Sequence, residues 1–120
     1  MEFEQDDITG FRVEVPLEEL RPLRSAAFDT LLHGKYGNVI LELGQADFLI
    51  DVVEAEVAGD GASLSLTSEQ VEWLASCFDR AMLSGLIGMR TITAVEDLRV
   101  AAGVARAEAM LDRGLPPDFA

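Results

Sequence analysis

The chain has 120 residues, of which 49% are hydrophobic and 26% charged, which is typical of a single globular domain spanning 1–120 rather than a disordered acidic tail. Its 22 acidic and 9 basic residues give a net charge of −13, which disfavours direct binding to nucleic acid or to an anionic membrane. No apolar run approaches the roughly 18 residues that span a bilayer, and no signal-peptide pattern is present, so we expect a cytoplasmic protein.

The N-terminal third predicts one strand and one helix. Residues 11–15 read FRVEV and alternate apolar with charged side chains, as a half-buried strand does. Pro16 ends this strand, and Pro22 suits the first position of a helix that runs to His33 and stops at Gly34. We assign His33 to the favourable end of the helix dipole, because no partner residue or pocket marks it as a catalytic base.

The central third contains apolar runs with branched side chains, joined by short connections that contain Gly. These runs are residues 38–43, 47–57 and 62–66. Their spacing predicts consecutive strands of an antiparallel meander. Strict alternation in the middle run would bury Glu54 and Glu56, so we expect a bulge near Val52 and Val53 that turns both glutamates outward.

The next predicted element is a helix that begins after Thr67. Thr67 and Gln70 have the spacing of a capping box, in which each side chain binds the other residue's free backbone N–H. Apolar residues at helical spacing form a core face, and acidic residues gather on the opposite side: Glu69, Glu72 and Asp79. Trp73 lies beside this acidic side, where it is either a core residue or, if partly exposed, an aromatic anchor for a partner.

A last helix is predicted from Thr93, which forms a second capping box with Glu96, to Arg113. Its two apolar stripes suit a helix that lies between two surfaces. The first stripe contains Leu98, Ala102, Ala105 and Ala109. The second stripe, which we expect to be the seam of a homodimer, contains Val100, Val104, Ala107 and Leu111. Together the elements predict an α+β fold in the order β-α-β-β-β-α-α, with helices packed on one face of a mainly antiparallel sheet.

The sequence contains no residue set that indicates catalysis, a metal or a cofactor. Cys77 is the single cysteine and has no cation among its sequence neighbours, so we predict a structural thiol. The acidic residues of the central third lack the spacing of a calcium loop, and no cluster of His and Cys suits zinc. We therefore predict a protein that is not an enzyme and that binds no cofactor.

The acidic residues are distributed unevenly along the chain. Residues 1–79 hold 17 acidic and 4 basic residues, whereas residues 80–120 hold 5 of each. Solubility, genomic base composition or a salty habitat would also account for a high acidic content. Adaptation to the solvent should place acids on every exposed face, however, and the last predicted helix is balanced. The asymmetry therefore favours a surface that meets a cationic partner.

The candidate partner-binding residues are acidic, with one aromatic anchor: Asp51, Glu54, Glu56, Asp60, Glu69, Glu72, Trp73 and Asp79. Proteins that handle nucleic acid present arrays of Lys and Arg to the phosphates, and a folded array of carboxylates can occupy such a surface. We therefore predict a stoichiometric inhibitor that mimics nucleic acid and blocks a basic partner protein. In size and charge alone, the chain is similar to small phage-encoded inhibitors of bacterial defence nucleases, such as anti-CRISPR proteins, and to immunity proteins for nuclease toxins.

A second interpretation is an acidic dimeric chaperone, an adaptor or a structural subunit of a larger assembly. Such a protein would hold its partner through apolar surfaces, with the second stripe as the seam between two copies. Charge reversal at the acidic residues would then matter little, whereas Val104→Asp or Leu111→Asp would break the complex.

Overall fold

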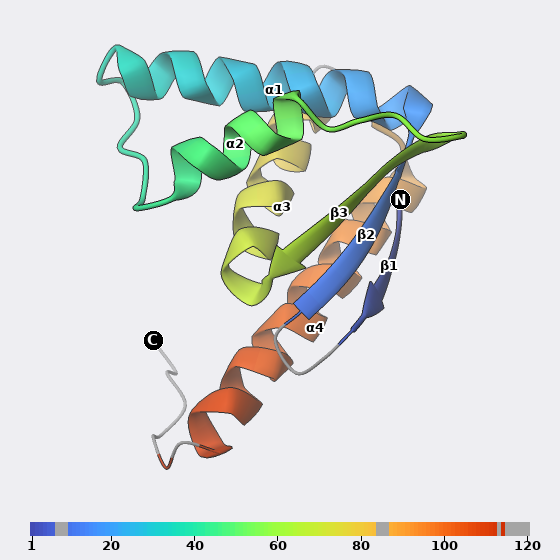
Figure 1. The fold of residues 1–120 in the computed structure, drawn as a ribbon, viewed down its shortest axis with the longest axis vertical. Coiled ribbons are helices and arrows are strands. Elements are labelled where there is room, and N and C mark those ends of the chain that lie inside the picture. The colour runs from blue at the N-terminus through green and yellow to red at the C-terminus, as the bar shows by residue number, and fades with distance from the viewer. Residues whose placement is uncertain (7–9, 84–86, 113, 115–120) are drawn as a thin grey trace.

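The computed structural model describes residues 1–6, 10–83, 87–112 and 114 (Figure 1). Within these ranges the chain forms one three-stranded antiparallel sheet and four helices. The elements are β1 (Glu2–Gln5), β2 (Gly10–Pro16), α1 (Leu17–Lys35), α2 (Gln45–Val53), β3 (Gly61–Thr67), α3 (Ser68–Met82) and α4 (Met89–Asp112). The predicted α+β class is therefore confirmed, and the order of elements agrees in part.

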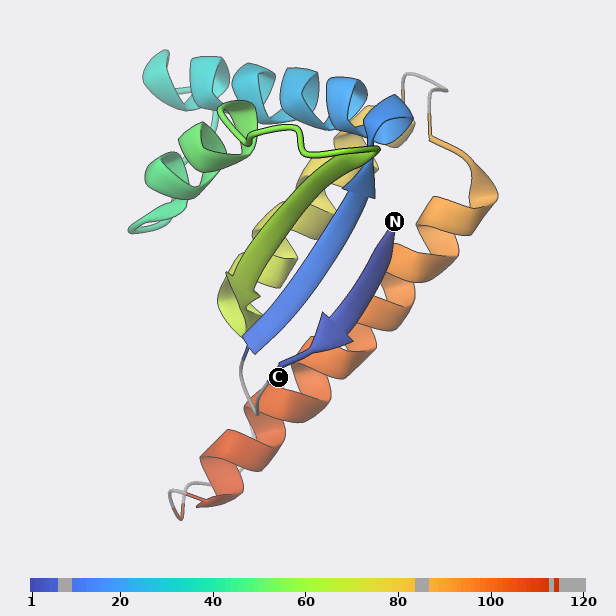
Figure 2. The ribbon, with the colours of Figure 1, turned by 45° about the vertical axis from the view of Figure 1, so that its right-hand side comes forward.

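The sheet has the order β1-β2-β3, with α3 and α4 behind it and α1 and α2 across one end of its strands (Figure 2). In the central strand β2, Phe11, Val13 and Val15 are buried on the helix side, while Arg12 and Glu14 lie on the open side. This alternation is the pattern of a strand with one buried face. The strands predicted at 11–15 and 62–66 are both confirmed.

Two other predicted strands, at 38–43 and 47–57, are wrong. Residues 45–53 form the helix α2, and residues 38–43 belong to no helix or strand. The expected bulge near Val52 and Val53 therefore does not exist. Phe48, Leu49 and Val52 are buried together because Val52 lies four residues after Phe48 and three after Leu49, and both offsets place side chains on the same side of a helix. The branched side chains in this segment favoured the strand interpretation, and burial against α1 overrides that preference.

The third strand of the sheet comes from the N-terminal residues. β1 pairs antiparallel with β2, with Phe3 opposite Val13. Glu2, Phe3 and Glu4 do alternate in polarity, but four residues with two charges give only a weak strand signal. The segment forms a strand because its backbone pairs with β2, and not because of its own sequence pattern.

The helix boundaries also differ from those predicted. α1 begins at Leu17, so Pro22 lies in its second turn rather than at its start, and the helix continues past Gly34 to Lys35. α4 begins at Met89, so Thr93 lies inside the helix and its expected capping role is wrong. Residues 85 and 86, in the connection before α4, and Arg113, the predicted end of that helix, lie outside the described residues.

The predicted capping box at the start of α3 is confirmed. The backbone N–H of Gln70 donates to the Thr67 hydroxyl oxygen at 3.3 Å, and the Thr67 N–H donates to the Gln70 side-chain oxygen at 2.9 Å. From this fixed start α3 runs through the centre of the core, where Val71, Leu74 and Phe78 are buried. No helix within the described ranges combines the length and the apolar character needed to cross a membrane.

Cys77 lies on the buried side of α3. Burial raises the pKa of its thiol from 9.0 to about 12, against a smaller lowering effect of Arg80. We expect the folded protein to react with a thiol reagent such as DTNB at pH 8 no faster than global unfolding allows, because only the thiolate attacks. Full and rapid labelling after addition of urea is the control, and equally rapid labelling of the folded protein would contradict the burial of Cys77.

Candidate protein-binding surface

One side of α2 faces solvent and combines carboxylates with an apolar side chain. The residues that share this side, here called the α2 face, are Asp47, Ile50, Asp51 and Glu54, at offsets of three, four and seven residues. All are exposed, and Ile50 retains 41% of its accessible surface. The same segment that buries Phe48, Leu49 and Val52 therefore presents acidic residues around an exposed isoleucine.

Two carboxylates of the α2 face, Asp51 and Glu54, lie toward the C-terminal end of the helix, where a negative charge is unfavourable, whereas Asp47 lies in the first turn, where it is favourable. The last turn of α2 contains no basic residue, although the negative end of the helix dipole favours a cation there. Asp47 and Asp51 are four residues apart, where like charges repel. Among the described residues, no Lys, Arg or His forms an ion pair with Asp47, Asp51 or Glu54.

Neutralising Glu54 should stabilise the fold. We expect Glu54→Gln to raise the free energy of unfolding by about 0.3–1 kcal/mol in urea denaturation, because it removes a negative charge from the C-terminal end of α2. Glu18→Gln is the matched control, since Glu18 lies in the first turn of α1, where a negative charge is favourable, and its loss should lower stability. A stability loss in Glu54→Gln would mean that Glu54 is satisfied by the fold itself.

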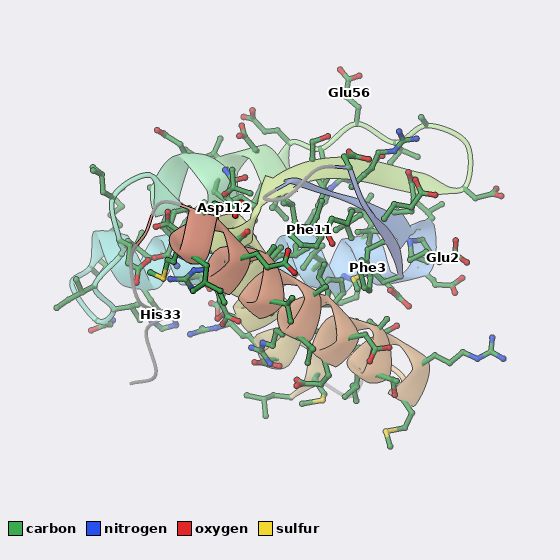
Figure 3. All side chains as sticks on the ribbon, turned by 90° about the horizontal axis from the view of Figure 1, so that it is seen from below. Glu2, Phe3, Phe11, His33, Glu56 and Asp112 are labelled. Carbon is green, nitrogen blue, oxygen red and sulfur yellow. The ribbon has the colours of Figure 1, made fainter. Side chains whose placement is uncertain are left out.

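An acidic loop, residues 54–60, follows α2 and leads into β3. It contains Glu54, Glu56 and Asp60, and Figure 3 shows Glu56 projecting away from the ribbon. The loop is held by Arg24 of α1, whose guanidinium donates to the backbone carbonyl of Ala55. Because that carbonyl is neutral, the arginine fixes the loop without using one of its carboxylates as a partner.

Of the two interpretations of Trp73, the structure supports the core residue and not the exposed anchor. Trp73 retains only 8% of its accessible surface, and its ring packs against Phe48 with ring centroids 5.7 Å apart. Its indole Nε1 donates to Glu42 Oε2 at 3.0 Å. The helical spacing that placed Trp73 beside the acidic side of α3 was correct, but α2 and the segment before it cover the ring.

A hollow of about 760 Å³ opens beside Trp73. Its lining includes three carboxylates, from Glu42, Glu69 and Glu72, together with Arg106 of α4. The structure thus brings Glu69, Glu72 and Trp73 together as the sequence predicted, and adds Glu42 from the segment before α2. The edge of the hollow carries Ile40, which is 94% exposed.

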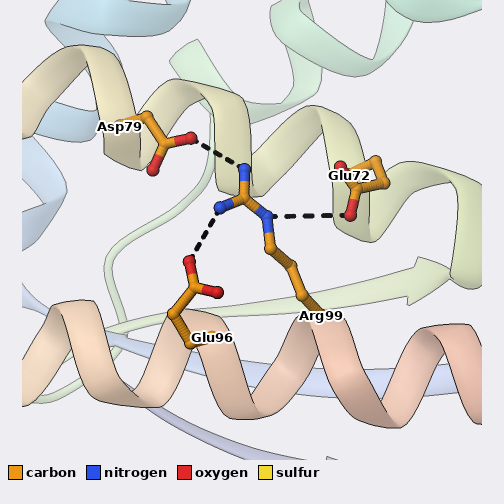
Figure 4. A network of polar contacts seen from close by, with 4 residues as sticks. All are labelled: Glu72, Asp79, Glu96 and Arg99. Atoms are coloured by element: carbon orange, nitrogen blue, oxygen red, sulfur yellow. Dashed lines mark hydrogen bonds and ion pairs between the residues drawn. The ribbon is translucent and has the colours of Figure 1, made fainter.

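Glu72 and Asp79 are engaged within the fold by ion pairs to Arg99. Figure 4 shows Arg99 of α4 contacting both, with an Nε–Oε1 distance of 3.6 Å to Glu72 and an Nη2–Oδ2 distance of 2.7 Å to Asp79. Glu96 completes the cluster at 2.9 Å from Arg99 Nη1. The hydrogen bond to Asp79 is the largest influence that raises the pKa of Arg99, so this residue stays charged and joins α3 to α4.

Several surface residues were missed by sequence reasoning. Glu42 and Asp47 lay in segments interpreted as strands, and the exposure of Ile40, Leu43 and Ile50 followed from no strand pattern. Leu43 is 99% exposed just before Gly44, whose positive φ of 84° starts α2. A helical reading of 45–53 would have placed Asp47 and Ile50 beside Asp51, so the period of the pattern was the missed signal.

The second stripe lies on α4 as predicted from its spacing. Val100, Val104 and Leu111 are exposed, and Ala107 is half-buried. The opposite side of the helix is buried through Leu98, Ala102 and Ala105. The described residues thus leave an apolar surface on the outside of α4.

Within the described residues, no group of three or more His, Cys, Asp or Glu side chains is arranged to hold a metal ion. The hydroxyl of Thr91 donates to Glu19, which also contacts the amino group of Met1 at 3.3 Å, and both contacts join α1 to neighbouring elements.

Comparison with family models, with curated proteins and with solved structures finds no match for this chain.

Proposed function

We propose that this protein binds a basic surface of another protein through the α2 face and the acidic loop, and thereby keeps nucleic acid from that surface. The observation that supports the proposal is the α2 face itself. Asp47, Asp51 and Glu54 surround exposed Ile50, and no cation of the described residues is paired with them.

The unfavourable position of Asp51 and Glu54 toward the C-terminal end of α2 is accounted for if a partner supplies the missing cations. A surface evolved to bind phosphates presents Lys and Arg over a broad area, and these cations can pair with carboxylates at comparable spacing. Ile50 and Leu43 add exposed apolar area, which carboxylates alone do not provide and on which interfaces commonly depend. The interaction is stoichiometric and non-catalytic, and we place it in the cytoplasm.

The residues of the proposed interface differ in part from the partner-binding residues predicted from the sequence. Asp51, Glu54, Glu56 and Asp60 remain in the interface, and Glu69 contributes at the hollow beside Trp73. Glu72 and Asp79 are left out because both already pair with Arg99, and Trp73 because it is buried. Asp47, Ile50 and Leu43 are added.

The proposal is tested by affinity capture from host lysate over a salt series, with identification of the eluted proteins by mass spectrometry. We expect a basic, nucleic-acid-handling protein to be retained at low salt and released as the salt concentration rises. The same capture with Asp47→Lys, Asp51→Lys and Glu54→Lys together is the control. Recovery of no basic protein, or equal recovery by the control, would contradict the proposal.

The second stripe on α4 supports an alternative function as a dimeric adaptor or assembly subunit. Val100 and Val104 remain 67% and 53% exposed, and apolar residues at this spacing suit pairing with another helix. In this case Val104→Asp would abolish self-association and partner capture, whereas the charge reversals on α2 would leave both unchanged.

A further inference from the structure

The outer side of β3 is an open sheet edge. β3 pairs with β2 from Gly61 to Thr67, and the sheet order places no described strand on its other side. In an antiparallel pair, alternate residues direct their N–H and C=O groups away from the neighbouring strand. For residues 62–66, no backbone hydrogen bond to any described element other than β2 is found. The outward groups at the two ends of β3 are already engaged, because the Gly61 carbonyl accepts from the Ala58 N–H at 2.8 Å and the Thr67 N–H donates to Gln70. The outward groups of Ser63 and Ser65, between these ends, remain available to another strand.

The composition of β3 gives this edge no protection. The strand reads GASLSLT, without a charge or a proline, and its ladder to β2 is continuous without a bulge. Exposed edges are normally blunted by such features. The opposite edge of the sheet differs, because β1 is short, carries Glu2 and Glu4, and packs against α4. The β1 edge of the sheet is thus protected against pairing with another strand, and the β3 edge is not.

Carboxylates lie at both ends of the open edge. Asp60 immediately precedes β3, and Glu69 lies in the first turn of α3, which follows it. If two copies of β3 paired antiparallel about Leu64, Asp60 of each would approach Glu69 of the other, and the like charges would repel. An incoming strand with Lys or Arg would meet these carboxylates favourably. The charges therefore favour a basic strand over a second copy.

We propose that an extended, basic segment of the partner adds to the sheet along the outer side of β3. Backbone hydrogen bonds to Ser63 and Ser65 supply affinity, as in other cases of strand addition, and Asp60 and Glu69 select for cationic side chains. On the helix side of the sheet, half-buried Leu64 offers an apolar contact to alternate residues of the incoming strand. This inference rests on the proposed function, because it takes the partner to be basic.

The probe for this site is the synthetic peptide Lys-Val-Lys-Val-Lys-Val-Lys, compared with the same peptide methylated at every backbone nitrogen. Methylation keeps the charges and removes the N–H donors. We expect the unmethylated peptide to bind at least about tenfold more tightly and to slow hydrogen exchange at backbone amides of β3, followed by NMR. The double variant Asp60→Asn with Glu69→Gln should weaken its binding.

Three results would overturn strand addition. Equal binding of the two peptides would show attraction to charge alone, and failure of both to bind would show that the edge is closed. Protection of the β3 amides that rises with protein concentration, without peptide, would identify a second copy as the occupant. The lysate capture described above does not depend on backbone donors, so the proposed function can stand when strand addition fails.

Discussion

Reversing three charges on α2, with Asp47→Lys, Asp51→Lys and Glu54→Lys together, should weaken binding to the captured basic partner at least about 100-fold, or about 3 kcal/mol. The reason is that each substitution replaces an attraction with a repulsion at the centre of the proposed interface. Isothermal titration calorimetry or surface plasmon resonance at fixed ionic strength measures the change. The three side chains are exposed, so the fold should survive, which circular dichroism checks.

The matched control makes the same total change of charge on another helix. Asp97, Glu108 and Asp112 are exposed residues of α4, and their replacement by Lys alters the net charge equally. We expect this control to weaken binding only slightly, through the long-range field of the whole protein. Equal losses in both triple variants would mean that total charge, and not the α2 face, determines binding.

Gly61→Ala should lower the free energy of unfolding by about 3 kcal/mol, the largest effect on stability that we expect from one methyl group. A Cβ at Gly61 would overlap the backbone carbonyl oxygen of Val15 and lie 2.9 Å from its carbon. Both strands are fixed by their ladder, in which Gly61 lies opposite Pro16, so the backbone cannot easily move away. Urea denaturation measures the loss.

Gly103→Ala is the control for this substitution. Gly103 lies within α4, and a Cβ there would meet no atom within 4 Å, so alanine should raise the free energy of unfolding by about 0.5–1 kcal/mol. A Gly61→Ala variant as stable as the wild-type protein would mean that β2 and β3 do not approach as closely as described. A loss of unfolding free energy in Gly61→Ala together with a gain in Gly103→Ala would support the packing at both positions.

The sequence predicted an element correctly where its local pattern had a single interpretation. The strand around Val13, the capping box of Thr67 and Gln70, and the buried and exposed sides of α4 were all predicted from spacing. The strand and the capping box also had a recognisable end, whereas for α4 only the spacing was correct, because its predicted start at Thr93 was wrong. The α+β class follows from these elements together.

The segment 38–57 was misread because branched apolar residues suit both a buried strand and a short helix. The helix α2 forms because it buries Phe48, Leu49 and Val52 against the rest of the core, which is a tertiary effect. β1 was missed for a related reason, since its pairing with β2 is not encoded in its own four residues.

The candidate surface was predicted only in part. The cation-free stretch between Lys35 and Arg80 indicated where negative charge collects, and Asp51, Glu54 and Glu56 are indeed exposed there. Pairing between α3 and α4 was beyond sequence reasoning, because Arg99 reaches Glu72 and Asp79 only once the two helices pack together. The same packing separates carboxylates that hold the fold together from those that remain available to a partner.

This protein and nucleic acid should compete for one basic surface of the partner, and a displacement titration distinguishes competition from simultaneous binding. A fluorescently labelled duplex is bound to the captured partner, and its anisotropy is followed as this protein is added. We predict that the duplex is released in full near one equivalent, and that the α2 triple-Lys variant releases none. A stable ternary complex, with the anisotropy unchanged at saturating protein, would contradict the account.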